Sequence, residues 1–177
     1  MTRLKKILAP TDFSRNSRVG LSFALSLAAE NSAELVVLHV ESEFKAWQIP
    51  DEAGFFSDRV YRWEVDRIVR EATLDLNNFL EKYREELRRV PQARRRVVLG
   101  DVVEKIVDVA RDEEADLVVM SPRAHGSLRR FFLGSVTDKV TRRAPCPVLS
   151  ICSTQVARQP SGRRMPTMRG ILQGSEA

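Results

Sequence analysis

The residues best suited to binding a charged ligand come just before the last helical pattern of the sequence. Gly134 and Ser135 precede an apolar pattern that begins at Val136, and Thr137 adds a second hydroxyl group. The N-terminus of a helix has free N–H groups and a partial positive charge, so it attracts phosphate. A glycine there lets the phosphate approach the backbone. An ordinary Gly-Ser helix cap has the same appearance, so this signal needs support from the rest of the chain.

A second candidate ligand-binding residue is Asp12, which follows the first strand-like run. Its carboxylate could accept hydrogen bonds from a ribose hydroxyl or an adenine amino group. Aspartate is also common in turns and helix caps, so both interpretations of Asp12 stay open. In an open parallel sheet, ligands bind beyond the carboxyl ends of the strands, where the strand order reverses. We therefore expect Asp12 and the loop at 121–137 to face one crevice.

The sequence offers little catalytic chemistry. His39 lies inside an apolar run and is interpreted as a half-buried, hydrogen-bonded residue, whereas His125 lies in a loop and contacts either ligand or solvent. No nucleophile, base and orienting group can be combined into a set, and no spacing of His, Cys and carboxylates predicts a metal site. The phosphate-binding motifs GxxxxGK[ST] and GxGxxG are both absent. We expect no enzyme, or at most a slow ATPase.

Short apolar runs predict the strands that position these residues. Five such runs, rich in β-branched residues, lie near Ile7, Val36, Val98, Val118 and Leu149. Each run is continuous rather than alternating, which is typical of strands covered on both faces. Strands of this kind, separated by helices, form right-handed βαβ units and a parallel sheet. The fold class is therefore α/β.

Helical patterns alternate with the strand-like runs. Their apolar stripes begin at Gly20, Val65, Val103 and Val136, and Pro145 ends the last one. Serines between 14 and 17 offer N-cap residues for the first helix. The stripe from Val65 continues to Leu87 and predicts one long amphipathic helix.

Two segments fit neither period. Residues 41–60 form a long connection with Pro50 and Gly54 as breakers, and long connections of this kind often serve as lids or partner surfaces. The basic run "RRVPQARRR" at 88–96 precedes the third strand and is interpreted as a solvated helix end.

Composition limits the classes of protein that this chain can belong to. Its 177 residues, with a net charge of +5, suit one domain. No apolar run reaches the length of a membrane span and no signal peptide is evident, so we expect a soluble, cytoplasmic protein without membrane partners.

Cys146 and Cys152 are interpreted as small buried thiols. Residues 153–177 predict a flexible basic tail, and the lack of aromatics among its arginines argues against a nucleic-acid partner.

Four stretches carry a resemblance to a known family. The motifs "KKILAPTDFS", "ELVVLHV", "DLVVM" and above all "LGSVTDKVTRRAPCPVLSI" resemble those of universal stress proteins, over about residues 3–152. The resemblance implies a domain at 1–152 with a Rossmann-like, adenine-nucleotide-binding fold. This fold is an open five-stranded parallel sheet of order 3-2-1-4-5 between helices. The resemblance also implies a homodimer, joined either by the last strands, here Val148 to Ile151, or by the long helix.

Members of the family that bind ATP share a loop of Gly, two residues, Gly, nine residues, Gly, and then Ser or Thr. Counting back from Gly134 places Ala124 on the second glycine and Ser121 on the first, so the spacing is intact but two glycines are replaced. Val40 and Met120 fit the apolar places beside the base. The resemblance thus implies a set of nucleotide-binding residues: Pro10, Thr11, Asp12, Val40, Met120, Ser121, Ala124, Gly134, Ser135, Val136 and Thr137.

Two functions remain open from the sequence. The first is a dimeric regulatory module that binds ATP or AMP, with Mg²⁺ if the ligand is ATP, and acts through unidentified protein partners in the stress response. The second is a member of the same family that binds no nucleotide and works as a protein-interaction module. The replacements at Ser121 and Ala124 favour the second, because an added side chain could block the ligand.

Overall fold

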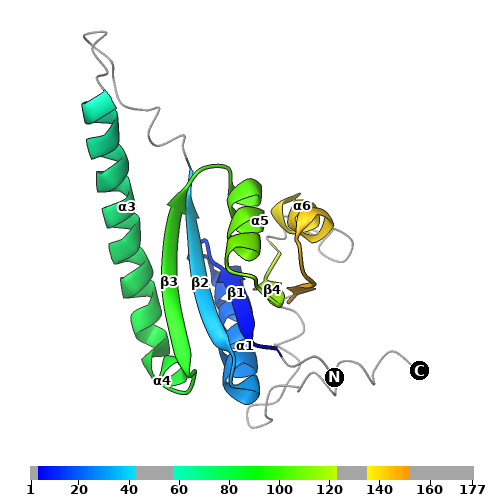
Figure 1. Ribbon diagram of the computed structural model, residues 1–177. Coiled ribbons are helices and arrows are strands. Elements are labelled where there is room, and N and C mark those ends of the chain that lie inside the picture. Colours follow the sequence, from blue (N-terminus) through cyan, green and yellow to red (C-terminus); the bar gives the residue numbers. More distant parts are fainter. Residues whose placement is uncertain (1–3, 43–57, 123–134, 152–177) are drawn as a thin grey trace.

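The computed structural model describes residues 4–42, 58–122 and 135–151 (Figure 1). Several predictions fall on other residues and therefore lie outside the described ranges. These concern most of the long connection, Ala124, His125, Gly134, Cys152 and the basic tail.

A five-stranded parallel sheet forms the centre of the molecule, and its strand order is β3-β2-β1-β4-β5. The predicted fold class and strand order are confirmed. The strands are β1 (Lys6–Pro10), β2 (Glu34–Glu41), β3 (Gln92–Leu99), β4 (Leu117–Met120) and β5 (Val148–Ser150).

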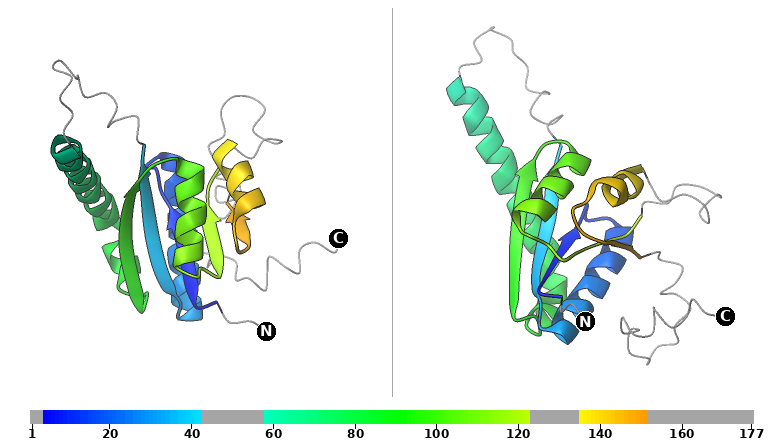
Figure 2. Two further views of the ribbon diagram at one scale, coloured as in Figure 1. Left: turned by 45° about the horizontal axis from the view of Figure 1, so that its top comes forward. Right: turned by 45° about the vertical axis from the view of Figure 1, so that its right-hand side comes forward.

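Helices cover both faces of the sheet and make three layers (Figures 1 and 2). They are α1 (Arg15–Asn31), α3 (Asp58–Leu80), η1 (Glu81–Tyr83), α4 (Arg84–Leu87), α5 (Val102–Asp112) and α6 (Ser135–Arg143). The stripe that predicted one helix from Val65 to Leu87 is thus divided by the short 3-10 turn η1. All elements except η1 correspond to a predicted strand or helix.

The hydrophobic core is divided between the two faces of the sheet because successive side chains of a strand point to opposite sides. Ile7 and Val37 face α1 and α3, whereas Leu8 and Val36 face α5 and α6. All four side chains are fully buried. This explains why the first, second and fourth runs are continuously apolar. Strand β1 lies in the middle of the sheet.

Asp116, just before β4, ties the start of β4 to the start of β1. Its Oδ2 accepts hydrogen bonds from the backbone N–H groups of Lys5 (2.7 Å) and Lys6 (2.9 Å). These hydrogen bonds are consistent with the register of the two strands, in which Ile7 lies opposite Leu117 and Leu8 opposite Val118. The carboxyl ends of β1 and β4 are thereby placed side by side.

Helix caps set the start of the two helices nearest those carboxyl ends. Ser14 is the N-cap of α1, and its Oγ accepts a hydrogen bond from the N–H of Ser17 (3.2 Å). Asp101 is the N-cap of α5, and its Oδ1 accepts from Val103 N (3.0 Å) and Glu104 N (2.9 Å). Such caps satisfy N–H groups that have no partner within the helix.

The basic run at 88–96 differs from its predicted place, because its second half belongs to β3. Residues 92–95 are exposed and residues 96–99 are half-buried, so β3 is not covered on both faces as predicted. It lies at one edge of the sheet and borders solvent. Arginine is tolerated there because its long stem lies along the strand while its guanidinium remains in water.

A network of ion pairs surrounds Glu113, at the C-terminus of α5. Its carboxylate pairs with Lys6 of β1 (3.5 Å) and with Arg94 and Arg96 of β3, the latter at 2.9 Å. Glu113 is only 8% exposed. The network joins α5 to the amino-terminal end of β1 and to β3. In the part of the chain that the structure describes, no helix is long and apolar enough to cross a membrane.

Candidate ligand-binding site

A cavity of about 340 Å³ opens at the carboxyl ends of β1 and β4, between the first turns of α1, α5 and α6. This is the switch point of the sheet, because the chain leaves β1 toward β2 on one side and reaches β4 on the other. Nine of the eleven residues predicted to bind nucleotide line the cavity: Pro10, Thr11, Asp12, Val40, Met120, Ser121, Ser135, Val136 and Thr137. Ala124 and Gly134 lie outside the described residues.

Thr11 holds the floor of the cavity in place. Its backbone N–H donates to Leu38 O (2.8 Å), which extends the contact between β1 and β2 by one residue. Its Oγ1 lies 3.1 Å from Ser17 Oγ and accepts a hydrogen bond from Phe13 N (3.2 Å). These bonds fix the turn from β1 into α1.

Asp12 belongs both to this turn and to the cavity wall. Its Oδ1 accepts a hydrogen bond from Ser14 N (3.0 Å), as expected for a turn residue before a helix. Its side chain is exposed, and Asp12 also lines the cavity. The two interpretations of Asp12 are therefore compatible, because one carboxylate oxygen can serve the turn while a ligand approaches the carboxylate from the cavity.

His39 of β2 stabilises the same turn through a hydrogen bond to Thr11. It is buried, and its Nδ1 donates to Thr11 O (2.9 Å), so the expectation of a hydrogen-bonded histidine is confirmed. Its Nε2 lies 3.6 Å from Glu41 Oε2. The ring stacks on Phe13 with 4.1 Å between centroids, and Phe13 has a positive φ of 62°. Since a bulky residue rarely adopts that conformation, packing around Phe13 must stabilise the turn.

The first turn of α6 supplies the polar rim opposite Asp12. Ser135 is exposed at the mouth, and Thr137 is buried with 2% of its surface exposed. Val136 packs against the core cluster that includes α5. The N-terminal end of this helix therefore borders the cavity and presents hydroxyl and N–H groups to it.

Apolar residues form the other wall of the cavity, and several of them were not predicted from the sequence. Leu38, Val102 and Ile106 line the cavity together with the predicted Val40 and Met120. Signals for them were present in the sequence. Leu38 lies two residues before Val40, on the same face of β2. Val102 and Ile106 are four residues apart at the start of a helix that follows a strand.

The side chain of Ser121 packs against helix α1. Its Oγ is buried and has no hydrogen-bond partner among the described residues. A Cβ built on Gly20 of α1 would lie 3.0 Å from this oxygen, so the hydroxymethyl group packs against α1. The residue lines the cavity, but the absence of a side chain at Gly20 provides the space for its hydroxyl.

Cys146 precedes β5 and is half-buried, so it is less buried than the small buried thiol that the sequence predicted. Burial raises the pKa of the Cys146 thiol, and the charge of Asp116 raises it further. A thiol with a raised pKa is a poor nucleophile at neutral pH. Across residues 4–42, 58–122 and 135–151, no group of three or more His, Cys, Asp or Glu side chains is arranged to hold a metal ion.

The sheet order and the cavity at its switch point define an open, doubly wound α/β protein. Comparison with known families matches residues 3–151 to the universal stress protein family. The chain belongs to this family.

Individual relatives agree with this assignment. Universal stress protein MJ0577 of Methanocaldococcus jannaschii is 31% identical over 154 residues, covering 83% of this chain and 94% of the relative. The solved structure of universal stress protein UspA from Lactobacillus plantarum has a TM-score of 0.63 at 25% identity, covering 85% of this chain and 99% of that one. A universal stress protein solved in complex with cAMP has a TM-score of 0.56 at 22% identity, covering 86% and 99%.

Proposed function

We propose that the cavity at the switch point binds an adenine nucleotide, and that the protein is a regulatory module of the stress response rather than an enzyme. The observation that carries this proposal is the division of the cavity into two chemically different halves. One half is the apolar wall on β2, β4 and α5, and the other is the hydroxyl-bearing first turn of α6. A nucleotide has a matching division into a flat base and a charged phosphate chain.

The proposed pose follows from this division. The base lies against Val40 and Met120, the ribose hydroxyls donate to Asp12, and the phosphates lie near Ser135 and Thr137 at the start of α6. The partial positive charge of the helix N-terminus favours phosphate at that end. If the ligand is ATP, a Mg²⁺ ion accompanies the phosphates. AMP would use the base and ribose contacts with fewer phosphate contacts.

Two further observations support the proposal. The cavity volume of about 340 Å³ lies in the range of small-molecule sites. A universal stress protein of the same fold has been solved in complex with cAMP, which is itself an adenine nucleotide. At 22% identity that likeness concerns the fold, so the argument for this chain depends on its own cavity.

We further propose that the protein acts in the cytoplasm as a homodimer joined through β5. This strand, Val148–Ser150, is the last strand at its end of the described sheet. Ser150 Oγ is buried without a hydrogen-bond partner among the described residues. Pairing β5 with its copy would cover an edge that otherwise invites unspecific pairing.

The nucleotide proposal is tested by calorimetric titration of ATP, ADP, AMP and cAMP, with and without Mg²⁺, against the protein and its Ser135→Asp variant. Aspartate at a helix N-terminus favours the helix, so this variant keeps α6 folded while it repels phosphate. We expect its affinity for ATP to fall by about tenfold or more. The control variant is Asn78→Asp, which adds the same charge at an exposed position of α3 and should bind as the parent does.

Denaturing the purified protein before titration and measuring released adenine absorbance excludes a site that is already filled. A protein that carries no nucleotide and binds none of the four ligands at millimolar concentration would contradict the proposal. That result would favour the alternative, an interaction module whose cavity is closed to nucleotide. Equal loss of affinity in the Ser135→Asp and Asn78→Asp variants would show that charge alone, and not the cavity, attracts the ligand.

A further inference from the structure

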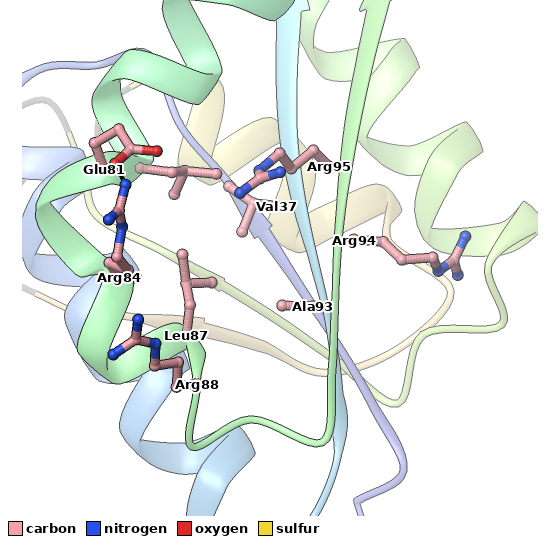
Figure 3. Close-up of a pocket in the computed structure, with 9 residues that line it drawn as sticks. Val37, Glu81, Arg84, Leu87, Arg88, Ala93, Arg94 and Arg95 are labelled. Atoms are coloured by element: carbon pink, nitrogen blue, oxygen red, sulfur yellow. Dashed lines mark hydrogen bonds and ion pairs between the residues drawn. The ribbon is translucent and has the colours of Figure 1, made fainter.

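A second groove, separate from the proposed nucleotide cavity, lies at the β3 edge of the sheet, between β3 and α4 (Figure 3). It encloses about 330 Å³ and shares no lining residue with the first cavity. Its floor is apolar and consists of Val37, Leu80, Leu87 and Ala93. Its rim is charged, with one glutamate and several arginines.

The arginines of β3 point to opposite sides of the strand, because successive side chains of a strand alternate. Arg94 points toward α5, where it pairs with Glu34 and Glu113, and Arg95 points toward the groove (Figure 3). Arg95 is exposed, and its side chain makes no hydrogen bond or ion pair with another described residue. The groove side of β3 therefore presents a cation that is available to a partner.

Arg84 of α4 and Arg88, the residue that follows this helix, add to this charge. Arg84 pairs with Glu81, and Arg88 pairs with Glu85 at 2.8 Å, each within a single turn of helix. Both pairs are exposed, with more than half of each side chain in contact with solvent. Exposed pairs of this kind contribute little and exchange readily, so both arginines can turn to an incoming carboxylate.

The backbone of β3 is also available. No strand lies beyond β3 within residues 4–42, 58–122 and 135–151, so its outward N–H and C=O groups have no ladder partner there. In Figure 3 the strand stands at the front, with α3 and α4 on one side and α5 on the other. An edge of eight residues is long enough to serve as a template for another strand.

We propose that the edge of β3 binds an extended, acidic segment of a partner protein by strand addition. The backbone of the segment would continue the sheet, and its alternate side chains would enter the groove. There, aliphatic residues would pack on Leu87 and Ala93, and carboxylates would pair with Arg95. Strand addition combines main-chain hydrogen bonds with pockets for alternate side chains, and the groove and the edge of β3 provide both.

Charge excludes two other occupants. A second copy of this edge would bring one Arg95 toward another, and like charges that face each other oppose pairing. Residues 153–177 of the chain itself contain four arginines and one glutamate, so they are repelled as well. A nucleic acid is disfavoured because the groove has no aromatic residue on which a base could stack. An acidic protein segment fits both the charge and the shape.

The test uses a fluorescein-labelled peptide of eight residues with blocked ends, in which every second residue is leucine or glutamate, so that both kinds of side chain lie on one face of the strand, and the residues between them are threonine. Its binding to the full-length protein is measured by anisotropy at low and at moderate salt. We expect saturable binding that falls by about tenfold or more in the Arg95→Glu variant. The matched control is Arg111→Glu, which makes the same change of charge at an exposed position of α5 and should leave affinity within about twofold.

Two further probes separate strand addition from simple charge attraction. The same peptide with alternate backbone N-methyl groups keeps its side chains but cannot pair with a strand, so it should not bind. An oligonucleotide of equal charge should not compete. Hydrogen exchange of the complex should show new protection within residues 92–99.

Three results would overturn the proposal: no binding of the unmodified peptide, equal binding of the N-methylated one, or equal loss in both arginine variants. Effective competition by the oligonucleotide would instead assign the groove to polyanions in general and would also overturn it. None of these results affects the nucleotide proposal, because the two cavities share no residue.

Discussion

Gly20 of α1 lies directly against Ser121 at the end of β4. A Cβ on Gly20 would come within 3.0 Å of Ser121 Oγ, 3.2 Å of Met120 C and 3.2 Å of Ser121 N. The first contact involves a side chain, but the other two involve backbone that cannot easily move. Helix α1 therefore approaches β4 this closely only because residue 20 has no side chain.

This contact predicts that Gly20→Ala destabilises the protein. Alanine in a helix interior is ordinarily favoured over glycine by about 0.5–1 kcal/mol, but overpacking costs about 1–3 kcal/mol. We expect a net loss of about 1–2 kcal/mol in the free energy of unfolding, measured by urea denaturation. Adding Ser121→Gly should restore only part of it, because the backbone contacts remain. Ser26→Ala, on the same helix, is the control and should change little.

Removing the Ser121 hydroxyl is predicted to leave stability unchanged or to raise it by up to about 1 kcal/mol, because this buried oxygen has no partner among the described residues. The matched change is Ser17→Ala. Ser17 Oγ lies 3.1 Å from Thr11 Oγ1 and donates to Ser14 O (3.0 Å), so its loss should cost about 1 kcal/mol. Thermal unfolding of the two variants compares them. A larger loss for Ser121→Ala than for Ser17→Ala would show that Ser121 has a bonding partner in solution.

The N-cap of α5 gives a third prediction. Asp101→Ala removes the acceptor of two backbone N–H groups and should lower the free energy of unfolding by about 1 kcal/mol. Asp101→Asn should retain most of it, because asparagine caps helices about as well. The control is Asp108→Ala, which removes the same charge from a half-buried position of the same helix and tests whether loss of charge alone has this effect. If Asp101→Ala and Asp108→Ala are equally stable, the cap contributes nothing.

The lowered pKa of Glu113 predicts that the free energy of unfolding decreases at acidic pH. Burial alone would raise the pKa of its carboxyl group, but hydrogen bonds from Arg94 and Arg96 and the charges of Arg94 and Lys6 outweigh burial and lower the pKa below its ordinary value of 4.5. A carboxyl group with a lowered pKa in the folded state stabilises the fold above its unfolded pKa. That stabilisation is lost as the pH falls through the folded pKa.

The Glu113→Gln variant should therefore be less stable than the parent at neutral pH, and the difference should shrink as the pH falls below 4.5 and through the lowered pKa of Glu113. Urea denaturation across this range measures it. Glu71→Gln, which removes an exposed pair with Arg67, should show almost no difference at any pH. A difference between Glu113→Gln and the parent that stays constant down to the lowest pH would contradict the prediction.

Most of the fold was predictable because buried strands appear as continuous apolar runs and amphipathic helices have a clear period. The runs around Ile7, Val36 and Val118 are buried on both faces, and their continuous hydrophobicity reveals that. Strand β3 was only half recognised, because an edge strand need not be apolar and its arginines resembled a solvated helix end. The 3-10 turn at Glu81–Tyr83 was missed because a change of hydrogen-bond pattern leaves the apolar stripe almost intact.

The candidate site was predictable where it follows the chain and less so where it depends on packing. Asp12 and Ser135 are at strand and helix ends, and the rule for parallel sheets brings such ends together. The direction of the Ser121 side chain depends on Gly20, which is about a hundred residues earlier in the sequence. No local pattern shows that contact. The same holds for His39, whose partner Thr11 lies 28 residues away.

The central position of β1 has a consequence for folding of the chain while it is being synthesised on the ribosome. One side of β1 pairs with β2 soon after both emerge, but the other side waits for β4, and the bond from Lys6 N to Asp116 spans 110 residues. Until most of the chain has been synthesised, the most central strand is an open edge of the nascent protein. Loop closure over such a distance is slow, and an unpaired edge attracts unspecific partners. Chaperones that shield nascent chains would therefore matter most between the synthesis of β2 and that of β4.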